Sequence, residues 1–288
     1  MTILNLTQKL PFLAFSTLTL GIAFTTVNPQ SAEAAAVRSG FSSNVLPAND
    51  DGSTGAVPVG FDLDFFGVMT DEVFVNNNGN ITLDSPLDTF TPFDLTSTGQ
   101  QIIAPFFADV DTRGSGSSPV TYGTGTVDGR DAFGVNWVDV GFFAENDEPL
   151  NSFQLVLIDR SDIGAGDFDI EFNYDRILWE TGEASDGNSD GLGGDSARAG
   201  FSNGTGNPGT SFELPGSAVN GAFLNDGSNA LISNRLNSDV DGRYIFEARN
   251  GNIMVDPDPT SVPEPASILG LLAIGALGTT SLKRKKSS

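Results

Sequence analysis

Hydrophobic and polar residues alternate along much of the middle of the chain. Phe168, Ile170, Phe172 and Tyr174 are separated by acidic or amide residues. This period of two is typical of a half-buried strand with one polar face. The run 152–158 is apolar more continuously, which predicts a strand that is covered on both faces. The residues 101–107 and 244–248 predict two further strands.

Short segments rich in Asn, Asp and Gly separate these strands and predict hairpins. The segments 76–79 (Asn-Asn-Asn-Gly) and 128–129 (Asp-Gly) each lie between two apolar runs, and these residues tolerate the positive φ of tight turns. Residues 161–166 also suit a turn, and 182–241 is rich in Gly, Asn, Ser and Asp. Because no long helical periodicity interrupts this region, the sequence predicts an all-β fold. We expect an antiparallel β-sandwich with long Gly/Asn/Asp-rich loops.

The N-terminus has the pattern of a secretory signal peptide. One lysine precedes a largely apolar run, and Ala32 and Ala34 form a small-residue cleavage site. We expect residues 1–34 to be removed by a signal peptidase that cuts after Ala34. A retained N-terminal membrane helix is the alternative. Residues 35–54 are expected to form a loop that leads into the folded domain.

Three features follow one another in residues 262–288. The segment starts with Val262, Pro263, Glu264 and Pro265, and it ends with the basic cluster Lys283, Arg284, Lys285 and Lys286. Between them, residues 266–282 carry no charge and predict a membrane helix of roughly 25 Å at ~1.5 Å per residue. The basic cluster is expected to stay in the cytoplasm as an anchor.

This ordered set resembles the PEP-CTERM sorting signal of bacteria that make extracellular polysaccharide. The resemblance implies recognition by a membrane-embedded exosortase, removal of the tail and delivery to the cell surface, outer envelope or extracellular matrix. It also implies transient anchoring in the inner membrane. A plain single-pass anchor is the alternative. Residues 251–261, which are rich in Pro and Asp, are expected to be a stiff linker to the tail.

The composition excludes several kinds of chemistry. The 288-residue chain has no Cys and no His, and no Lys lies between residues 35 and 265. Disulfides, Cys or His metal sites, Ser-His and Cys-His nucleophile pairs and lysine Schiff bases all need these residues. The formal net charge of −23 argues against nucleic acid as a partner, because proteins that bind it present a basic face.

The region 55–250 resembles the nidogen-like (NIDO) domain. The most specific matching block is 104–111 (Ala-Pro-Phe-Phe-Ala-Asp-Val-Asp), in which Phe107 stands where the family often has Trp. The other matching blocks, in family order around it, are 73–82, 133–138, 151–157, 168–174, 179–180 and 199–203. The resemblance implies an extracellular β-rich module of matrix and adhesion proteins, and it implies no enzyme activity.

The best metal candidate in the sequence is a loop with the spacing of a calcium site. Asp186, Asn188 and Asp190 occupy positions 1, 3 and 5, and a glycine follows at position 6. Position 12 is Ala197 rather than Glu, although Asp195 offers a substitute ligand from position 10. Loops of this composition are also ordinary solvated turns. No cofactor is certain, and Ca²⁺ is the one that this loop suggests.

Two other segments also carry closely spaced acidic residues. Asp109 and Asp111 place two carboxylates at a strand end beside Arg113. They suggest either a second cation site or a local Asp–Arg pair, and the sequence favours the pair. The segment 49–52 (Asn-Asp-Asp-Gly) predicts a turn and nothing more.

Taken together, these features predict an exported, surface-sorted, non-catalytic adhesion or matrix-interaction protein of the bacterial envelope or extracellular polysaccharide. Its expected partners are the exosortase, the signal peptidase and a polysaccharide or surface-protein ligand. Two alternatives stay open: an acidic Ca²⁺-dependent structural matrix protein, and a polysaccharide hydrolase that uses carboxylates alone. Trp137 and Trp179 lie on strand patterns, so we expect them in the core and not as sugar-stacking platforms.

Overall fold

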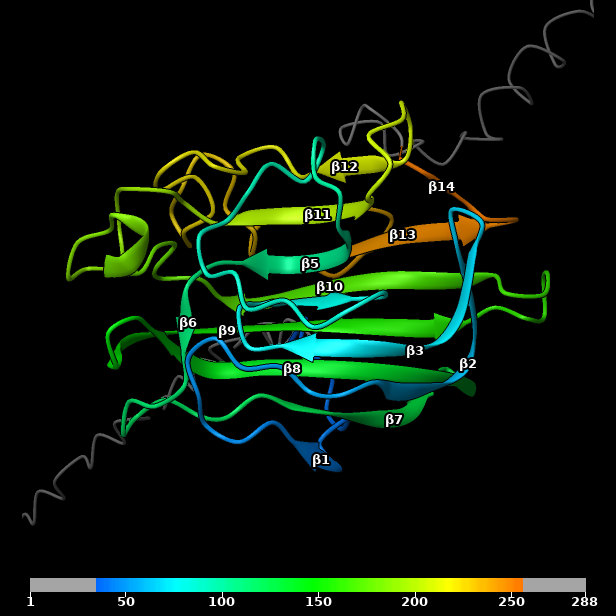
Figure 1. The fold of residues 1–288 in the computed structure, drawn as a ribbon, viewed down its shortest axis with the longest axis horizontal. Coiled ribbons are helices and arrows are strands. Elements are labelled where there is room, and N and C mark those ends of the chain that lie inside the picture. Colours follow the sequence, from blue (N-terminus) through cyan, green and yellow to red (C-terminus); the bar gives the residue numbers. More distant parts are fainter. Residues whose placement is uncertain (1–34, 256–288) are drawn as a thin grey trace, which may run out of the picture. The chain divides into compact units, whose positions relative to one another are not determined.

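The computed structural model describes residues 35–255, and their strands form two antiparallel sheets (Figure 1). This part of the chain contains no α-helix, only one 3₁₀ turn at Glu183–Ser185, which confirms the all-β prediction. No helix in residues 35–255 is long and apolar enough to cross a membrane. The predicted signal peptide and the predicted membrane helix at 266–282 lie outside the described residues.

The larger sheet has eight strands in the order β1-β7-β8-β9-β10-β13-β14, with β6 paired to β8. Their bounds are β1 (Asn44–Val45), β6 (Val110–Asp111), β7 (Thr121–Val127), β8 (Arg130–Phe142), β9 (Asn146–Asp159), β10 (Phe168–Arg176), β13 (Arg243–Arg249) and β14 (Asn252–Met254). The hairpin predicted at Asp128 and Gly129 joins β7 to β8, and both residues have positive φ. β14 occupies the first residues of the segment that was expected to be a linker.

The smaller sheet has six strands in the order β12-β11-β5-β4-β3-β2. Their bounds are β2 (Val57–Phe65), β3 (Val68–Asn76), β4 (Asn80–Thr82), β5 (Gln101–Phe107), β11 (Arg198–Asn203) and β12 (Ser211–Glu213). The predicted Asn-rich hairpin joins β3 to β4. Gly79 in this turn has a φ of +72°, and a Cβ there would lie 1.7 Å from the Phe106 carbonyl oxygen. Only glycine fits this position.

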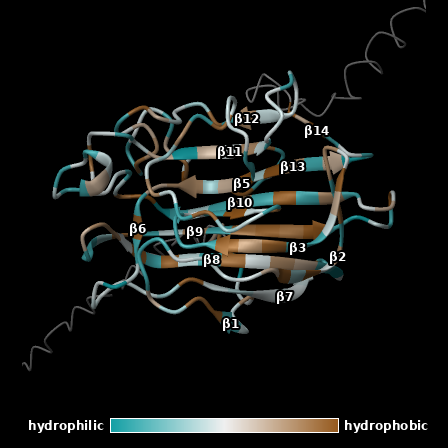
Figure 2. Cartoon of the chain, in the orientation of Figure 1, coloured by the Kyte–Doolittle hydropathy of each residue, from teal (hydrophilic) through white to brown (hydrophobic). Residues whose placement is uncertain are grey.

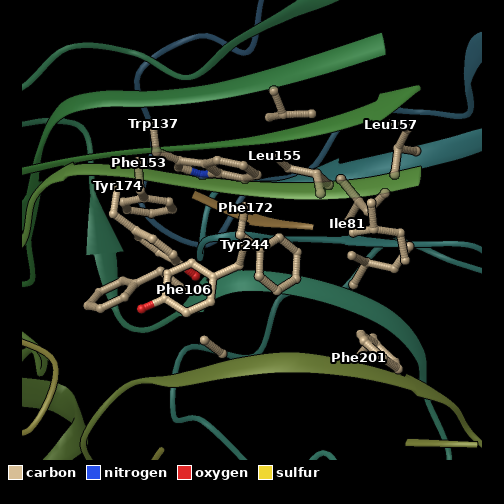
Figure 3. Packing of buried hydrophobic residues seen from close by; sticks show 14 of the residues in the cluster. Ile81, Phe106, Trp137, Phe153, Leu155, Leu157, Phe172, Tyr174, Phe201 and Tyr244 are labelled. Atoms are coloured by element: carbon tan, nitrogen blue, oxygen red, sulfur yellow. The ribbon is translucent and has the colours of Figure 1, made fainter. Parts of the chain in front are cut away.

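The main hydrophobic core lies between the two sheets and draws residues from both (Figure 3). Phe106 of β5 meets Phe153 of β9 with ring centroids 5.1 Å apart, and Phe153 stacks on Trp137 at 5.3 Å. Both Trp137 and Trp179 are fully buried, which confirms their predicted place in the core. Figure 2 shows the hydrophobic residues concentrated on central strands such as β3 and β9.

The expectation that β10 is only half-buried is wrong. Glu171 and Asn173 on its polar face are fully buried, because residues 36–41 cross the face of the larger sheet that points away from the main core. We call residues 36–41 the N-terminal strap. Its Phe41 forms a second small core with Val127, Ala132, Val156 and Ile158. The run 152–158 is buried on both faces, as predicted.

Candidate functional site

Three segments that are distant in the sequence converge at one end of the smaller sheet. They are the loop 49–52, the turn 76–79 and the connection between β5 and β6. One carboxylate oxygen from each of Asp50, Asp51 and Asp109 lies within 4.8 Å of the other two. We call these three residues the acidic triad. In residues 35–255 they are the only acidic group of this kind close enough to share a metal ion.

Side-chain hydrogen bonds hold the 49–52 loop in place beside the turn. The Asn77 amide donates to the backbone oxygens of Asp50 and, at 2.6 Å, of Val110. The Thr112 hydroxyl donates to the Asn49 carbonyl oxygen at 2.8 Å, and Asn49 Oδ1 accepts the Gly52 N–H at 2.6 Å. The loop is therefore positioned by the folded domain before any ligand arrives.

Asp109 is the most deeply buried member of the acidic triad. It lies between β5 and β6 and is 1 % exposed, and neither carboxylate oxygen has a hydrogen-bond partner in the described part of the chain. Burial raises the pKa of Asp109 to about 7, and the charges of Asp50, Asp51 and Asp111 add to the rise. The Ser185 hydroxyl acts in the opposite direction, but it lies outside hydrogen-bonding geometry.

The other two members are partly compensated. Asp50 Oδ2 accepts a hydrogen bond from Arg113 at 3.0 Å, while its buried Oδ1 has no partner within residues 35–255. Burial, followed by the charges of Asp111 and Asp51, raises the pKa of Asp50 to about 6. Asp51 Oδ1 accepts a hydrogen bond from the Asn78 amide at 2.9 Å. The only arginine that pairs with any of the three carboxylates of the acidic triad in the described residues is therefore Arg113, and Arg113 also pairs with Asp111.

The predicted local Asp–Arg pair is confirmed for Asp111 but not for Asp109. Arg113 contacts both oxygens of Asp111, with Nε–Oδ1 at 2.9 Å and an Nη2–Oδ2 distance of 2.6 Å. The backbone N–H groups of Arg113, at 3.0 Å, and of Glu145, at 2.8 Å, add two further hydrogen bonds to Asp111. These bonds lower the pKa of Asp111 in spite of its burial. Asp109, two residues away, receives no such bond in the described region.

The predicted calcium loop, residues 186–195, does not bring its carboxylates together as the acidic triad does. Asp186, Asn188, Asp190 and Asp195 are all exposed. Asn188 Oδ1 accepts the N–H groups of Asp190 at 2.9 Å and of Leu192 at 3.1 Å, as in an ordinary Asx turn. Calcium binding at this loop stays a prediction.

Sequence reasoning missed the acidic triad. Asp50 and Asp51 sit in a segment that looks like any polar turn, and Asp109 looks like a partner of Arg113. The only local signals were two adjacent carboxylates in a turn segment and, far along the chain, the specific Asp-Val-Asp block. The other predicted site residues, namely Ala32, Ala34, Val262, Pro263, Glu264, Pro265, Lys283, Arg284, Lys285 and Lys286, lie outside the described residues.

Two different family models match the folded domain and the C-terminal segment of this chain. The family model of the nidogen-like domain matches residues 71–250, and that of the PEP-CTERM protein-sorting motif matches 261–285. Alpha-tectorin of Mus musculus is 36% identical over 226 residues, which covers 70% of this chain and 10% of the mouse protein. The alpha-tectorins of Homo sapiens and Gallus gallus are each 35% identical over the same length.

The chain spans 10% of the length of these curated relatives, and no solved structure matches it. The nidogen-like match covers most of the described strands, from β3 to β13. The sorting motif implies processing by an exosortase and export to the cell surface. The chain therefore belongs to the nidogen-like (NIDO) domain family and is an exported surface or matrix protein that carries a PEP-CTERM sorting motif.

Proposed function

We propose that the processed protein is a non-catalytic adhesion or matrix-interaction protein, which binds extracellular polysaccharide or another surface protein. The main support for this proposal is that one chain contains both a nidogen-like domain and a PEP-CTERM motif. The domain supplies a rigid two-sheet scaffold, and the motif supplies the route to the surface. Loops at the ends of the strands are the expected contact regions, because loops on rigid scaffolds carry most binding functions.

The charge distribution limits the class of ligand. Each of the nine arginines in residues 35–255 forms at least one ion pair with an acid of the same domain. The remaining acids leave the described region strongly negative. An anionic polymer would be repelled by such a surface unless cations screened or bridged the charges. The favoured ligand is therefore a neutral polysaccharide, or an acidic one bound through divalent cations.

The hydrolase alternative receives little support from the acidic triad. Glycoside hydrolysis needs two carboxylates that flank the bond of a bound sugar. Asp109 is 1 % exposed, so a sugar ring cannot reach it without rearrangement. The Ca²⁺-dependent structural alternative is better supported, because the acidic triad offers oxygen ligands that the fold holds together.

Two experiments test the proposed function. The full-length chain, purified in mild detergent, is mixed with the extracellular polysaccharide of its host and sedimented, with and without EDTA. We expect co-sedimentation, and no binding of the polysaccharide or of isolated surface proteins would contradict the proposal.

For the sorting step, Pro263, Glu264 and Pro265 are replaced by alanine in the host. We expect the variant to keep its tail and to accumulate in the membrane fraction, because the exosortase no longer recognises it. Normal processing and release of this variant would contradict the proposed role of the motif.

A further inference from the structure

We propose that Asp50, Asp51 and Asp109 form a calcium-binding site that fastens the 49–52 loop to the connection between β5 and β6. This site is separate from the predicted 186–195 loop. It also stands apart from the adhesive function proposed above, because an ion that stabilises the domain would serve an exported protein with any ligand. Its test is therefore independent of polysaccharide binding.

The first argument is that Asp109 lacks the compensation that buried charges need. An ionised carboxylate without a partner is expensive to bury, so proteins pair it or coordinate it to a metal. Two other buried acids in this domain follow the rule: Glu171 contacts Arg38 at 2.6 Å, and Asp111 contacts Arg113 at 2.6 Å. Asp109 is 1 % exposed and both of its oxygens lack hydrogen bonds in residues 35–255.

The second argument is that the three carboxylates lie close together. One oxygen from each member of the acidic triad lies within 4.8 Å of the other two, a spacing at which three negative charges repel one another unless a cation lies between them. Asp109 offers two oxygens without hydrogen bonds, and Asp50 offers its buried Oδ1. A single proton would neutralise only one of the three carboxylates, whereas a divalent cation attracts all of them.

The third argument concerns the identity of the ion. The donor set consists of carboxylate oxygens, and the chain has no Cys or His, so ions that favour sulfur or nitrogen ligands are disfavoured. Ca²⁺ accepts six to eight oxygens in flexible arrangements, whereas Mg²⁺ needs near-ideal octahedral geometry and keeps several waters. Extracellular modules bind Ca²⁺ with dissociation constants of about 10⁻⁴–10⁻³ M. These properties fit an exported protein whose carboxylates come from two separate segments.

A glycine borders the site on its other side. Gly182 has φ −91° and ψ 165°, values that any residue adopts, so its backbone conformation does not require glycine. A Cβ at this position would lie 2.3 Å from Asp109 Oδ2. The absence of a side chain at residue 182 therefore keeps the Asp109 carboxylate free of contact on that side, and Gly182→Ala is expected to crowd it.

The test uses the full-length chain in mild detergent after treatment with EDTA. Thermal unfolding is followed by circular dichroism at increasing CaCl₂, and binding is measured in parallel by isothermal titration calorimetry. At tenfold the dissociation constant, linkage predicts that Ca²⁺ raises Tm by about 3–6 °C for a domain of this size. Asp109→Asn should abolish the rise in Tm, and Gly182→Ala should weaken it. MgCl₂ at the same concentration should give a smaller rise.

The matched control changes the other acidic loop. Asp186→Asn combined with Asp190→Asn removes the same kind of charge from exposed positions, and this variant should keep the full Ca²⁺ response. The proposal is overturned if the wild-type chain shows no response, if Asp109→Asn responds like the wild type, or if the control variant loses the response. Should Asp109→Asn fail to fold, Asp51→Asn replaces it, because Asp51 is only partly buried.

Discussion

Glu171 and Asp109 are both buried acids in the same domain, but their surroundings differ completely. Glu171 lies under the N-terminal strap, where Arg38 donates to both of its oxygens at 2.6 and 2.9 Å and Asn173 donates at 2.7 Å. Arg243 approaches it at 3.3 Å. Asp109 has neither an arginine nor a hydrogen bond within residues 35–255. Burial alone therefore does not distinguish these two acids, whereas the presence or absence of a partner does.

The difference also separates two roles for polar groups inside a protein. The Glu171 network is complete, so it fixes the N-terminal strap on the sheet in one arrangement. The acidic triad is incomplete, so the fold holds its carboxylates together against their mutual repulsion. A complete network supports structure without a ligand, and an incomplete one is stabilised by the ion that completes it.

The largest predicted effect is on the complete network. Glu171→Gln leaves the cations of Arg38 and Arg243 without their shared anion. We expect the free energy of unfolding to fall by about 3 kcal/mol, near the lower end of the range for broken buried pairs because Arg38 keeps partial exposure. Urea denaturation measures this change. Glu247→Gln is the control: this exposed acid lies 3.8 Å from Arg249, and its loss should change stability by less than about 0.5 kcal/mol.

The equivalent change in the incomplete network is predicted to have the opposite sign. In EDTA at pH 8, where Asp109 with its pKa of about 7 is mostly ionised, Asp109→Asn removes an uncompensated buried charge, and we expect the free energy of unfolding to rise by about 1–2 kcal/mol. The same urea experiment measures it. A destabilisation as large as that of Glu171→Gln would show that Asp109 is compensated in solution, and the contrast between the two sites would fail.

The smallest predicted effect concerns a buried neutral group with a partner. Tyr174 donates a hydrogen bond to the Pro105 carbonyl oxygen at 2.6 Å, and burial raises the pKa of its phenol well above the usual value. The folded-state pKa is thus higher than the unfolded value of about 10. Stability from this group is complete below pH 10 and decreases as the pH rises further.

Tyr174→Phe should therefore have two measurable consequences. At pH 7 it should lower the free energy of unfolding by about 1 kcal/mol through the lost hydrogen bond. Above pH 10 it should make the decrease of stability with pH shallower, which denaturation at several alkaline pH values measures. An unchanged slope above pH 10 would mean that Tyr174 ionises as easily in the folded state as in the unfolded state.

Local patterns in the sequence were sufficient for the strands and tight turns. Alternation around Phe172 predicted β10, continuous apolarity predicted β9, and the Asn-Gly and Asp-Gly segments predicted the hairpins that join β3 to β4 and β7 to β8. These features depend on neighbours in the chain, because side chains of a strand alternate between faces and tight turns need particular φ values. The nidogen-like family and the sorting motif were also recognisable from sequence.

The environment of the polar residues was decided by the tertiary structure. Glu171 and Asn173 of β10 look solvent-facing in the sequence, but both are buried, and Arg38 of the N-terminal strap pairs with Glu171. Asp50 and Asp51 look like a surface turn, but hydrogen bonds to Asn77 and Asn78 bring them to Asp109, more than fifty residues away along the chain. The period of a strand tells which face a side chain is on. What covers that face depends on contacts between distant segments, and this determines whether a buried charge is paired or left open.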